Sequence, residues 1–359
     1  MTQEQFDEAL LEAEKLRTGW KISDDLRDEG LELPGDVKSI RSLLYGPYGH
    51  WNLFDIYLPK AQDGKEAILP VIVSIHGGGW QYGDKELYRP YCMSLAQRGF
   101  AVVSFNYRLA PEDPFPAAFL DVNRMFAWIA RNGERFHLDR NRVFIVGDSA
   151  GAQMASWYAT LLTSASFREL YASSFPLAGA RHQAVPFTKE QYGEAGIAER
   201  LWKDIPEDSM VPDERTGFTV PADRLHVRGV ALNCGVYDVL TNMVNEVDSY
   251  FLHFLGELAE ESDSRKLTLK LVDSYGHQTK DFPPAFIMSA ANDFLLPCAE
   301  PMADHLKALG VKTSLHIYGQ KHQLFMGHVF HVNLKLREAA VCNDEECAFF
   351  RSLAADSSS

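Results

Sequence analysis

Ser149 is the residue whose setting in this sequence most clearly allows nucleophilic chemistry. It is the centre of a Gly-x-Ser-x-Gly motif at 147–151, which follows four consecutive apolar residues and precedes a stretch of helical character at 152–162. Such an apolar run is typical of a strand that is buried on both faces. A serine on the sharp turn from a strand into a helix projects outward, and the first N–H groups of the helix can stabilise an oxyanion. The pattern predicts that Ser149 is a catalytic nucleophile.

A serine nucleophile needs a base to accept its proton and an acid to orient that base. After an elbow of this type, the acid precedes the base along the chain. A predicted strand at 284–291 runs directly into Asp293, and the last predicted strand, at 313–318, is followed by a loop that contains His322. We therefore predict that Asp293 orients His322 and that His322 takes and returns the Ser149 proton.

Other residues compete for these roles. Asp238 also follows a predicted buried strand, at 229–237, and is an alternative acid, although support of a cap or a pocket is the preferred interpretation. His328 and His331 lie three residues apart and could suggest a metal pair on a helix. No acidic third ligand accompanies them, so we interpret them as packing or surface histidines and predict no metal site.

A second motif that could do chemistry is His-Gly-Gly-Gly-Trp at 76–80, directly after a predicted buried strand. Consecutive glycines allow backbone N–H groups to point at one spot, where a side chain would obstruct a ligand. We predict that the N–H groups of Gly78, Gly79 and Ala150 form an oxyanion hole. His76 is predicted to support this loop through a hydrogen bond. A phosphate-binding loop is disfavoured, because no Gly-Lys-Ser/Thr follows and the net charge is −14.

Together these motifs resemble the hormone-sensitive-lipase-like branch of the α/β-hydrolase esterases. The resemblance rests on the motifs at 76–80 and 147–151, Tyr-Arg-Leu-Ala-Pro-Glu at 107–112, Asp-Phe-Leu at 293–295, and His322. It implies hydrolysis of carboxylic esters with short to medium acyl chains through an acyl-enzyme, no cofactor, and a cap built partly from the N-terminal segment. One departure is the Gln-Leu-Phe sequence after His322, where the branch commonly has Gly-Phe.

Two alternative functions remain open. The same residues can hydrolyse amides, and His-Gly-Gly-x-Trp is also similar to the loops of formamidases, so an arylformamidase or a peptidase is the first alternative. Some members of the branch are hormone receptors that have lost the catalytic base. The presence of His322 disfavours such a ligand-binding function.

The elements that position these residues alternate between strands and helices. Strands are predicted at 69–75, 100–107 and 143–146, with helices at 88–98 and 115–132 between them. This alternation predicts an α/β fold with a mostly parallel central sheet that is flanked by helices on both faces.

The domain organisation predicted from the sequence has an N-terminal cap segment at 1–42 and a hydrolase domain at 43–359. The cap segment contains a predicted helix at 2–18 that ends at Gly19. Insertions at 173–228 and 239–282 begin near the carboxyl ends of predicted strands, where open α/β sheets bind their ligands. We therefore expect both insertions to join the N-terminal helix in a cap over Ser149.

The composition and net charge of the chain limit the kinds of partner that we expect it to bind. A 46% hydrophobic content over 359 residues supports a large core, and the net charge of −14 argues against nucleic acid or an anionic membrane. The N-terminus resembles no signal peptide, and no apolar run approaches the ~18 residues of a membrane span. Five scattered cysteines, Cys342 and Cys347 among them, fit a reducing compartment. We expect a cytoplasmic enzyme that acts on a small ester and that could form a homo-oligomer.

Overall fold

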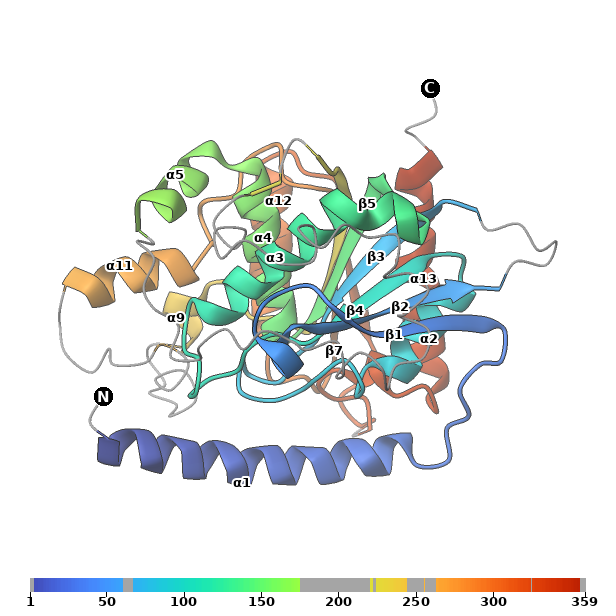
Figure 1. Cartoon of the computed structure of the whole chain (residues 1–359), viewed down its shortest axis with the longest axis horizontal. Helices are drawn as coiled ribbons and strands as arrows, with labels where there is room; N and C mark the ends of the chain where they lie inside the picture. Colours follow the sequence, from blue (N-terminus) through green and yellow to red (C-terminus); the bar gives the residue numbers. More distant parts are fainter. Residues whose placement is uncertain are drawn as a thin grey trace.

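An eight-stranded sheet forms the centre of the part of the chain that the structure describes (Figure 1). This computed structural model describes residues 3–60, 67–174, 220–221, 224–243, 255, 263–323 and 325–355, with the backbone alone described at 173–174, 243 and 263–267. The strand order is β1-β2-β4-β3-β5-β6-β7-β8. The strands are β1 (Val37–Leu44), β2 (Leu53–Pro59), β3 (Leu69–Ile75), β4 (Ala101–Phe105), β5 (Leu138–Asp148), β6 (Val227–Asn233), β7 (Ala285–Ala290) and β8 (Thr313–Tyr318).

The strand directions confirm the predicted mostly parallel sheet. From β4 through β8 every neighbouring pair is parallel, whereas β1 pairs with β2, and β2 with β4, in antiparallel fashion. The buried stretches of the central strands, such as 143–146 of β5, are apolar because both faces of the sheet are covered. Successive side chains alternate between the faces, so Ile145 packs into one core and its neighbour Phe144 into the other.

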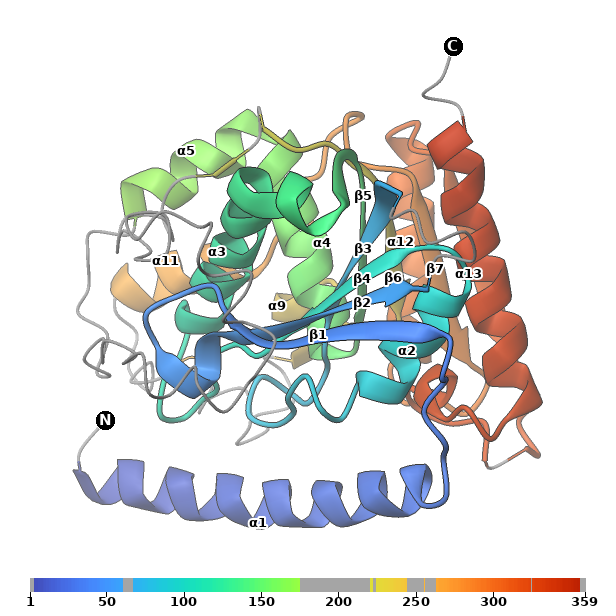
Figure 2. The ribbon, with the colours of Figure 1, turned by 45° about the vertical axis from the view of Figure 1, so that its right-hand side comes forward.

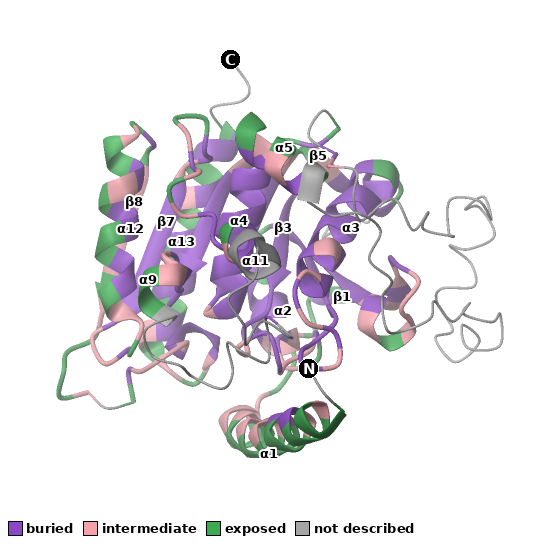
Figure 3. Ribbon diagram, turned by 90° about the vertical axis from the view of Figure 1, so that its left-hand side faces the viewer, coloured by how far each residue is buried: buried purple, intermediate pink, exposed green. Residues whose placement is uncertain are grey.

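Helices cover both faces of the sheet (Figure 2). The first face packs against α3 (Ala117–Asn132), α4 (Ala150–Thr163) and α12 (Leu296–Ala308), and the second against α2 (Arg89–Gln97) and α13 (Arg337–Ala355). Each layer contributes large buried aromatic side chains, such as Trp157 of α4 and Phe350 of α13. Figure 3 shows the buried sheet enclosed between these layers. The predicted α/β fold is therefore confirmed.

The N-terminal helix α1 (Gln3–Asp28) is longer than predicted. It passes through Gly19, where the sequence pattern placed its end. Glycine in a helix interior costs only about 1 kcal/mol, which other contacts can offset. Beyond Gly19 the helix gains an ion pair between Lys21 and Asp25 at 2.8 Å and another between Arg27 and Asp24 at 2.8 Å. The prediction that Gly19 ends the helix is wrong.

Helix α1 lies along the edge of the molecule, apart from the two helical layers (Figures 1 and 2). Arg17 fastens it to the loops that follow β3 and β4. The guanidinium donates to the carbonyl of Gln81 at 2.7 Å, to that of Ala110 at 2.9 Å, and to both carboxylate oxygens of Glu112 at 2.6 and 2.7 Å. The loop after β3 carries the glycine motif at 76–80, so α1 is held next to this motif.

The structure describes only parts of the two predicted insertions, so their place in a cap stays a prediction. Most of 173–228 lies outside the described residues. In 239–282 the described elements are α9 (Val239–Met243) and α11 (Asp263–Val272). The end of α11 packs on α4, where Trp157 Nε1 donates to the Leu271 carbonyl at 2.6 Å and Gln153 donates to that of Val272 at 2.7 Å. No helix in the described part of the chain is long and apolar enough to cross a bilayer.

Candidate active site

Ser149 occupies the turn between β5 and α4, as the motif predicts. Its backbone has φ +53° and ψ −121°, a region that non-glycine residues adopt only under strain. The flanking glycines allow this turn. A Cβ on Gly147 would overlap the Gly151 carbonyl, and a Cβ on Gly151 would overlap the Ile75 carbonyl of β3. The motif therefore needs both glycines for close packing of the turn against the sheet.

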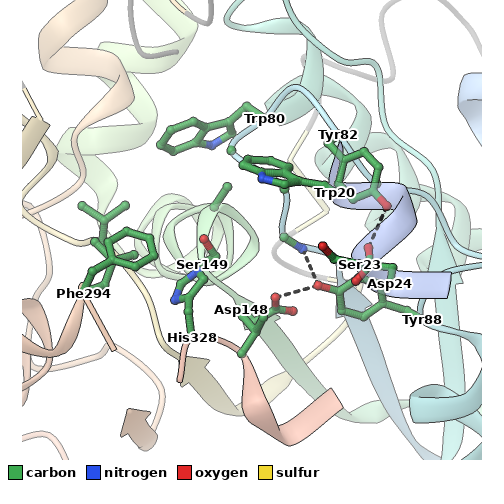
Figure 4. Close-up of a pocket in the computed structure, with 18 of the residues that line it drawn as sticks. Trp20, Ser23, Asp24, Trp80, Tyr82, Tyr88, Asp148, Ser149, Phe294 and His328 are labelled. Atoms are coloured by element: carbon green, nitrogen blue, oxygen red, sulfur yellow. Dashed lines mark hydrogen bonds between the residues drawn. The ribbon is translucent and has the colours of Figure 1, made fainter. Parts of the chain in front are cut away.

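Asp293 lies just beyond β7, but its histidine partner is His328. The two side chains are hydrogen-bonded, with 2.8 Å between His328 Nδ1 and Asp293 Oδ1. Figure 4 shows the His328 imidazole beside the Ser149 side chain, on the cavity wall. The interpretation of His328 as a packing or surface histidine is therefore wrong. His328 also lies outside any α-helix, so the imagined helical pair with His331 does not form.

His322 is exposed and does not line the cavity. It lies on a tight turn closed by a hydrogen bond from Gln323 N–H to the Gln320 carbonyl at 2.8 Å. The Asn292 side chain fixes the same turn by donating to the Gln323 carbonyl at 2.8 Å. The chain then returns to the core at Met326, which is fully buried. The predicted pairing of His322 with Asp293 is corrected, because the turn holds His322 in solvent.

The surroundings of Asp293 keep its carboxyl ionised. Burial alone would raise its pKa, but hydrogen bonds from His328, the Cys234 thiol and the Leu295 N–H hold the pKa below its usual value. Ser289 Oγ donates to the second carboxylate oxygen at 2.9 Å. A charged carboxylate with this many donors is fixed in orientation. It can hold His328 in one tautomer and stabilise its protonated form.

Cys234 follows β6, and its side chain lies next to Asp293 and His328. Its backbone is in the left-handed region at φ +49°, and its side chain is buried. Ligand atoms of Cys234, Asp293 and His328 lie within 4.8 Å of one another. Zinc accepts these three ligand types. The direct hydrogen bond between Asp293 and His328 accounts for their proximity without an ion, and we assign no metal to the site.

Asp238, the alternative acid, lies elsewhere. Its carboxylate accepts the Thr241 N–H at 3.1 Å and thereby caps the short helix α9. It does not line the cavity that contains Ser149.

The glycine motif forms a loop beside Ser149. Gly78 and Gly79 have φ of +112° and +57°, values that favour glycine, and a Cβ on Gly78 would overlap the Tyr82 carbonyl. Gly78, Gly79 and Ala150 all line the cavity together with Ser149. The predicted residues are therefore brought to one place.

His76 is buried beneath this loop. Its Nδ1 is hydrogen-bonded to the Gly77 carbonyl at 2.8 Å, and its ring stacks on that of Tyr107 with 4.0 Å between centroids. Burial lowers the pKa of His76 to about 4. At neutral pH the ring is uncharged, so it can donate this hydrogen bond but cannot serve as a cationic group.

The cavity has a volume of about 360 Å³ and opens over Ser149. Its walls are mostly apolar and aromatic, and four of its residues come from α1. These are Trp20, Ser23, Asp24 and Arg27. Their spacing of three and four residues is that of one helix face. The sequence prediction missed them because it ended the helix at Gly19.

The arrangement of sheet, helices and site is that of the α/β-hydrolase fold. The sheet order brings the serine elbow after β5, the acid after β7 and the histidine after β8 to one edge of the sheet, under the glycine loop that follows β3. Acyl transfer needs this set: a nucleophile, a base with its orienting acid, and oxyanion donors.

Comparison with known proteins agrees with this assignment of the fold. The BD-FAE family model matches residues 54–203, less than half of the chain. The isoprenylcysteine alpha-carbonyl methylesterase ICME of Arabidopsis thaliana is 28% identical over 284 residues, which cover 78% of this chain and 55% of the plant protein. Esterase LipI of Mycobacterium tuberculosis is 35% identical over 136 residues, 38% of each chain. The matched part of this chain thus spans about half of the first relative and less of the second.

Solved structures show the same fold. Esterase B from Lactobacillus rhamnosis superimposes with a TM-score of 0.73, at 22% identity, over 97% of both chains. A bacterial heroin esterase superimposes with a TM-score of 0.63, at 18% identity, over 94% of this chain and 90% of the other. The predicted resemblance to the α/β-hydrolase carboxylesterases is confirmed.

Proposed function

We propose that this protein is a serine carboxylesterase that cleaves esters of short to medium acyl chains through an acyl-enzyme. The observation that carries the proposal is the hydrogen bond between Asp293 and His328 on the side of the cavity where the imidazole meets Ser149 (Figure 4). A neutral serine is inert until such a base removes its proton.

In the proposed mechanism, Nε2 of His328 accepts the proton of Ser149 as the serine oxygen attacks the ester carbonyl. The carbonyl oxygen becomes an oxyanion that the N–H groups of Gly78, Gly79 and Ala150 stabilise. His328 then gives the proton to the departing alcohol, and Asp293 stabilises the protonated ring between these steps. A water molecule, activated by the same histidine, hydrolyses the acyl-enzyme and restores Ser149.

The cavity supports a small, uncharged substrate. Its volume of about 360 Å³ is near the lower end of the range for small-molecule sites. The charged residues from α1 pair with each other, since Arg27 and Asp24 are 2.8 Å apart, so they leave this wall without a free charge. Esterase B, which shares the fold, has been solved with a C4-C4 tributyrin phosphonate inhibitor. We also propose that α1 acts as the cap of this site.

Hydrolysis of p-nitrophenyl esters from acetate to laurate tests the proposal. Ser149→Ala should abolish turnover, and a fluorophosphonate probe should label Ser149 of the unmodified protein and nothing in the variant. Ser156→Ala is the matched control, because Ser156 is buried on the same helix and its Oγ has no hydrogen-bond partner among the described residues. It should keep the activity. Retained activity in Ser149→Ala would exclude the proposal, and faster cleavage of matched anilides than of esters would make the protein an amidase.

A further inference from the structure

Two hydrogen bonds in series join the glycine loop to the elbow, as Figure 4 shows. The Gly77 N–H donates to the Tyr88 hydroxyl oxygen at 3.1 Å, and that hydroxyl donates to Asp148 Oδ2 at 2.6 Å. Tyr88 directly precedes α2, and Asp148 is the last residue of β5, next to Ser149. Both side chains are buried, with exposed fractions of 8% and 2%.

The direction of this series is fixed by chemistry. An amide N–H can only donate, so the tyrosine hydroxyl accepts from Gly77 and directs its own proton to Asp148 Oδ2. Burial raises the pKa of Asp148 to about 7, and Oδ2 can accept this hydrogen bond in either protonation state of the carboxyl. Contact is also close, because a Cβ added to Gly77 would lie 2.6 Å from Asp148 Oδ2 and 2.9 Å from the Asp148 carbonyl oxygen. The glycine loop therefore packs directly against the elbow at Gly77, with no room for a side chain between them.

The peptide group between His76 and Gly77 is also held at its carbonyl end. Tyr107 donates its hydroxyl to the His76 carbonyl at 2.8 Å, and that carbonyl shares one planar peptide with the Gly77 N–H. Tyr107 and Tyr88 thus hold the two ends of one plane. The next plane, which carries the Gly78 N–H, is held by His76 Nδ1 on the Gly77 carbonyl. Glycines alone would leave these planes free to rotate.

We propose that Tyr88 and Asp148 are positioning residues for the oxyanion hole: they fix the His76–Gly77 peptide so that the loop N–H groups that follow it face the oxygen of the carbonyl that Ser149 attacks. The proposal rests on the esterase function proposed above. It assigns Asp148, the variable position of the serine motif, a role distinct from that of the triad. Asp148 acts through Tyr88 and the backbone.

Tyr88→Phe removes both hydrogen bonds while it keeps the ring. We expect kcat to fall about 10–100-fold with KM within about threefold, a smaller loss than the 10²–10³-fold that removal of an oxyanion donor itself causes. Asp148→Ala should show a similar fall. Asp148→Asn keeps an oxygen that can accept from Tyr88, so it should recover most of the rate. Tyr91→Phe is the matched control, since Tyr91 is buried in the first turn of α2, next to Tyr88, but its hydroxyl faces Glu346 at 3.4 Å.

The assay combines ester hydrolysis with active-site titration by a fluorophosphonate and with inhibition by an aryl trifluoromethyl ketone, which forms an oxyanion when Ser149 adds to it. Rates are expressed per titrated site, so partial unfolding does not mimic the effect. In Tyr88→Phe the Ki of the ketone should rise in proportion to the loss of kcat/KM, whereas Tyr91→Phe should match the unmodified protein. A normal rate and a normal Ki in Tyr88→Phe, with Ser149→Ala still inactive, would overturn this proposal and leave the esterase function intact.

Discussion

Separate substitution of His322 and His328, which both follow β8, distinguishes the two candidate bases. His328→Gln removes the ring that is hydrogen-bonded to Asp293, and His322→Gln removes an exposed ring on the neighbouring turn. We expect kcat for p-nitrophenyl butyrate to fall at least about 10⁴-fold in the first variant, which is about 5 kcal/mol of transition-state stabilisation. The second variant should stay within about twofold, because exposed substitutions away from the site change little.

The folded state should survive both exchanges. The hydrogen bond to the charged Asp293 contributes about 1–2 kcal/mol, because the His328 side chain is 24% exposed and partly screened by solvent. Asp293 keeps its bonds from Ser289 and the Leu295 N–H. A loss of this size leaves most of the 5–15 kcal/mol of a typical domain. Circular dichroism and urea unfolding check this before the rates are compared.

The assay is a steady-state rate at neutral pH, with active sites counted by fluorophosphonate labelling. The reasoning is refuted if His328→Gln keeps more than about a tenth of the activity, or if His322→Gln loses as much as His328→Gln is expected to lose. Either result would mean that the loop rearranges in solution and that the hydrogen bond to Asp293 does not identify the base.

Two further predictions concern the cavity wall and the core. Trp20→Ala should shift the preferred ester toward longer acyl chains or bulkier alcohols and raise KM for acetate esters a few-fold, since the indole covers Gly79 and lies 3.6 Å from where a Cβ on that glycine would be. Ile22→Ala, on the exposed side of the same helix, is the control in a chain-length series. An unchanged preference in Trp20→Ala would show that Trp20 does not shape the substrate site. Burial raises the pKa of Glu346 from 4.5 to about 7, so the native state keeps a proton that the unfolded chain loses, and stability falls as pH rises through this window. Glu346→Gln should therefore gain up to about 3 kcal/mol relative to the unmodified protein between pH 4.5 and pH 8 in urea unfolding, at about 1.4 kcal/mol per pKa unit; a difference that does not change with pH would contradict this.

Local signals in the sequence were enough for the sheet and for two of the three residues of the proposed triad. Each central strand contains a short apolar run, and Ser149 and Asp293 lie shortly after the ends of two such runs. A residue at the end of a strand is placed by that strand, and parallel strands end at the same edge of a sheet. The glycines at 77–79 are determined in the same way, because they follow β3 without an intervening loop.

The histidine and the cap depended on tertiary packing. His322 and His328 belong to one loop after β8, and both have the residue type that the chemistry needs. The turn at 320–323, which Asn292 fixes, holds His322 outward, and the buried Met326 brings the chain back so that His328 meets Asp293. The departure from Gly-Phe after His322 was the one signal of this in the sequence.

Helix α1 is a similar case, since the hydrogen bonds of Arg17 to distant loops hold Trp20 over the glycine motif. The sequence alone thus determined that a serine, an acid and a glycine loop meet at one edge of the sheet, because residues at strand ends are positioned by local structure. Only the tertiary structure decided which histidine pairs with Asp293 and which helix lines the cavity over Ser149, because both depend on contacts between segments far apart in the chain.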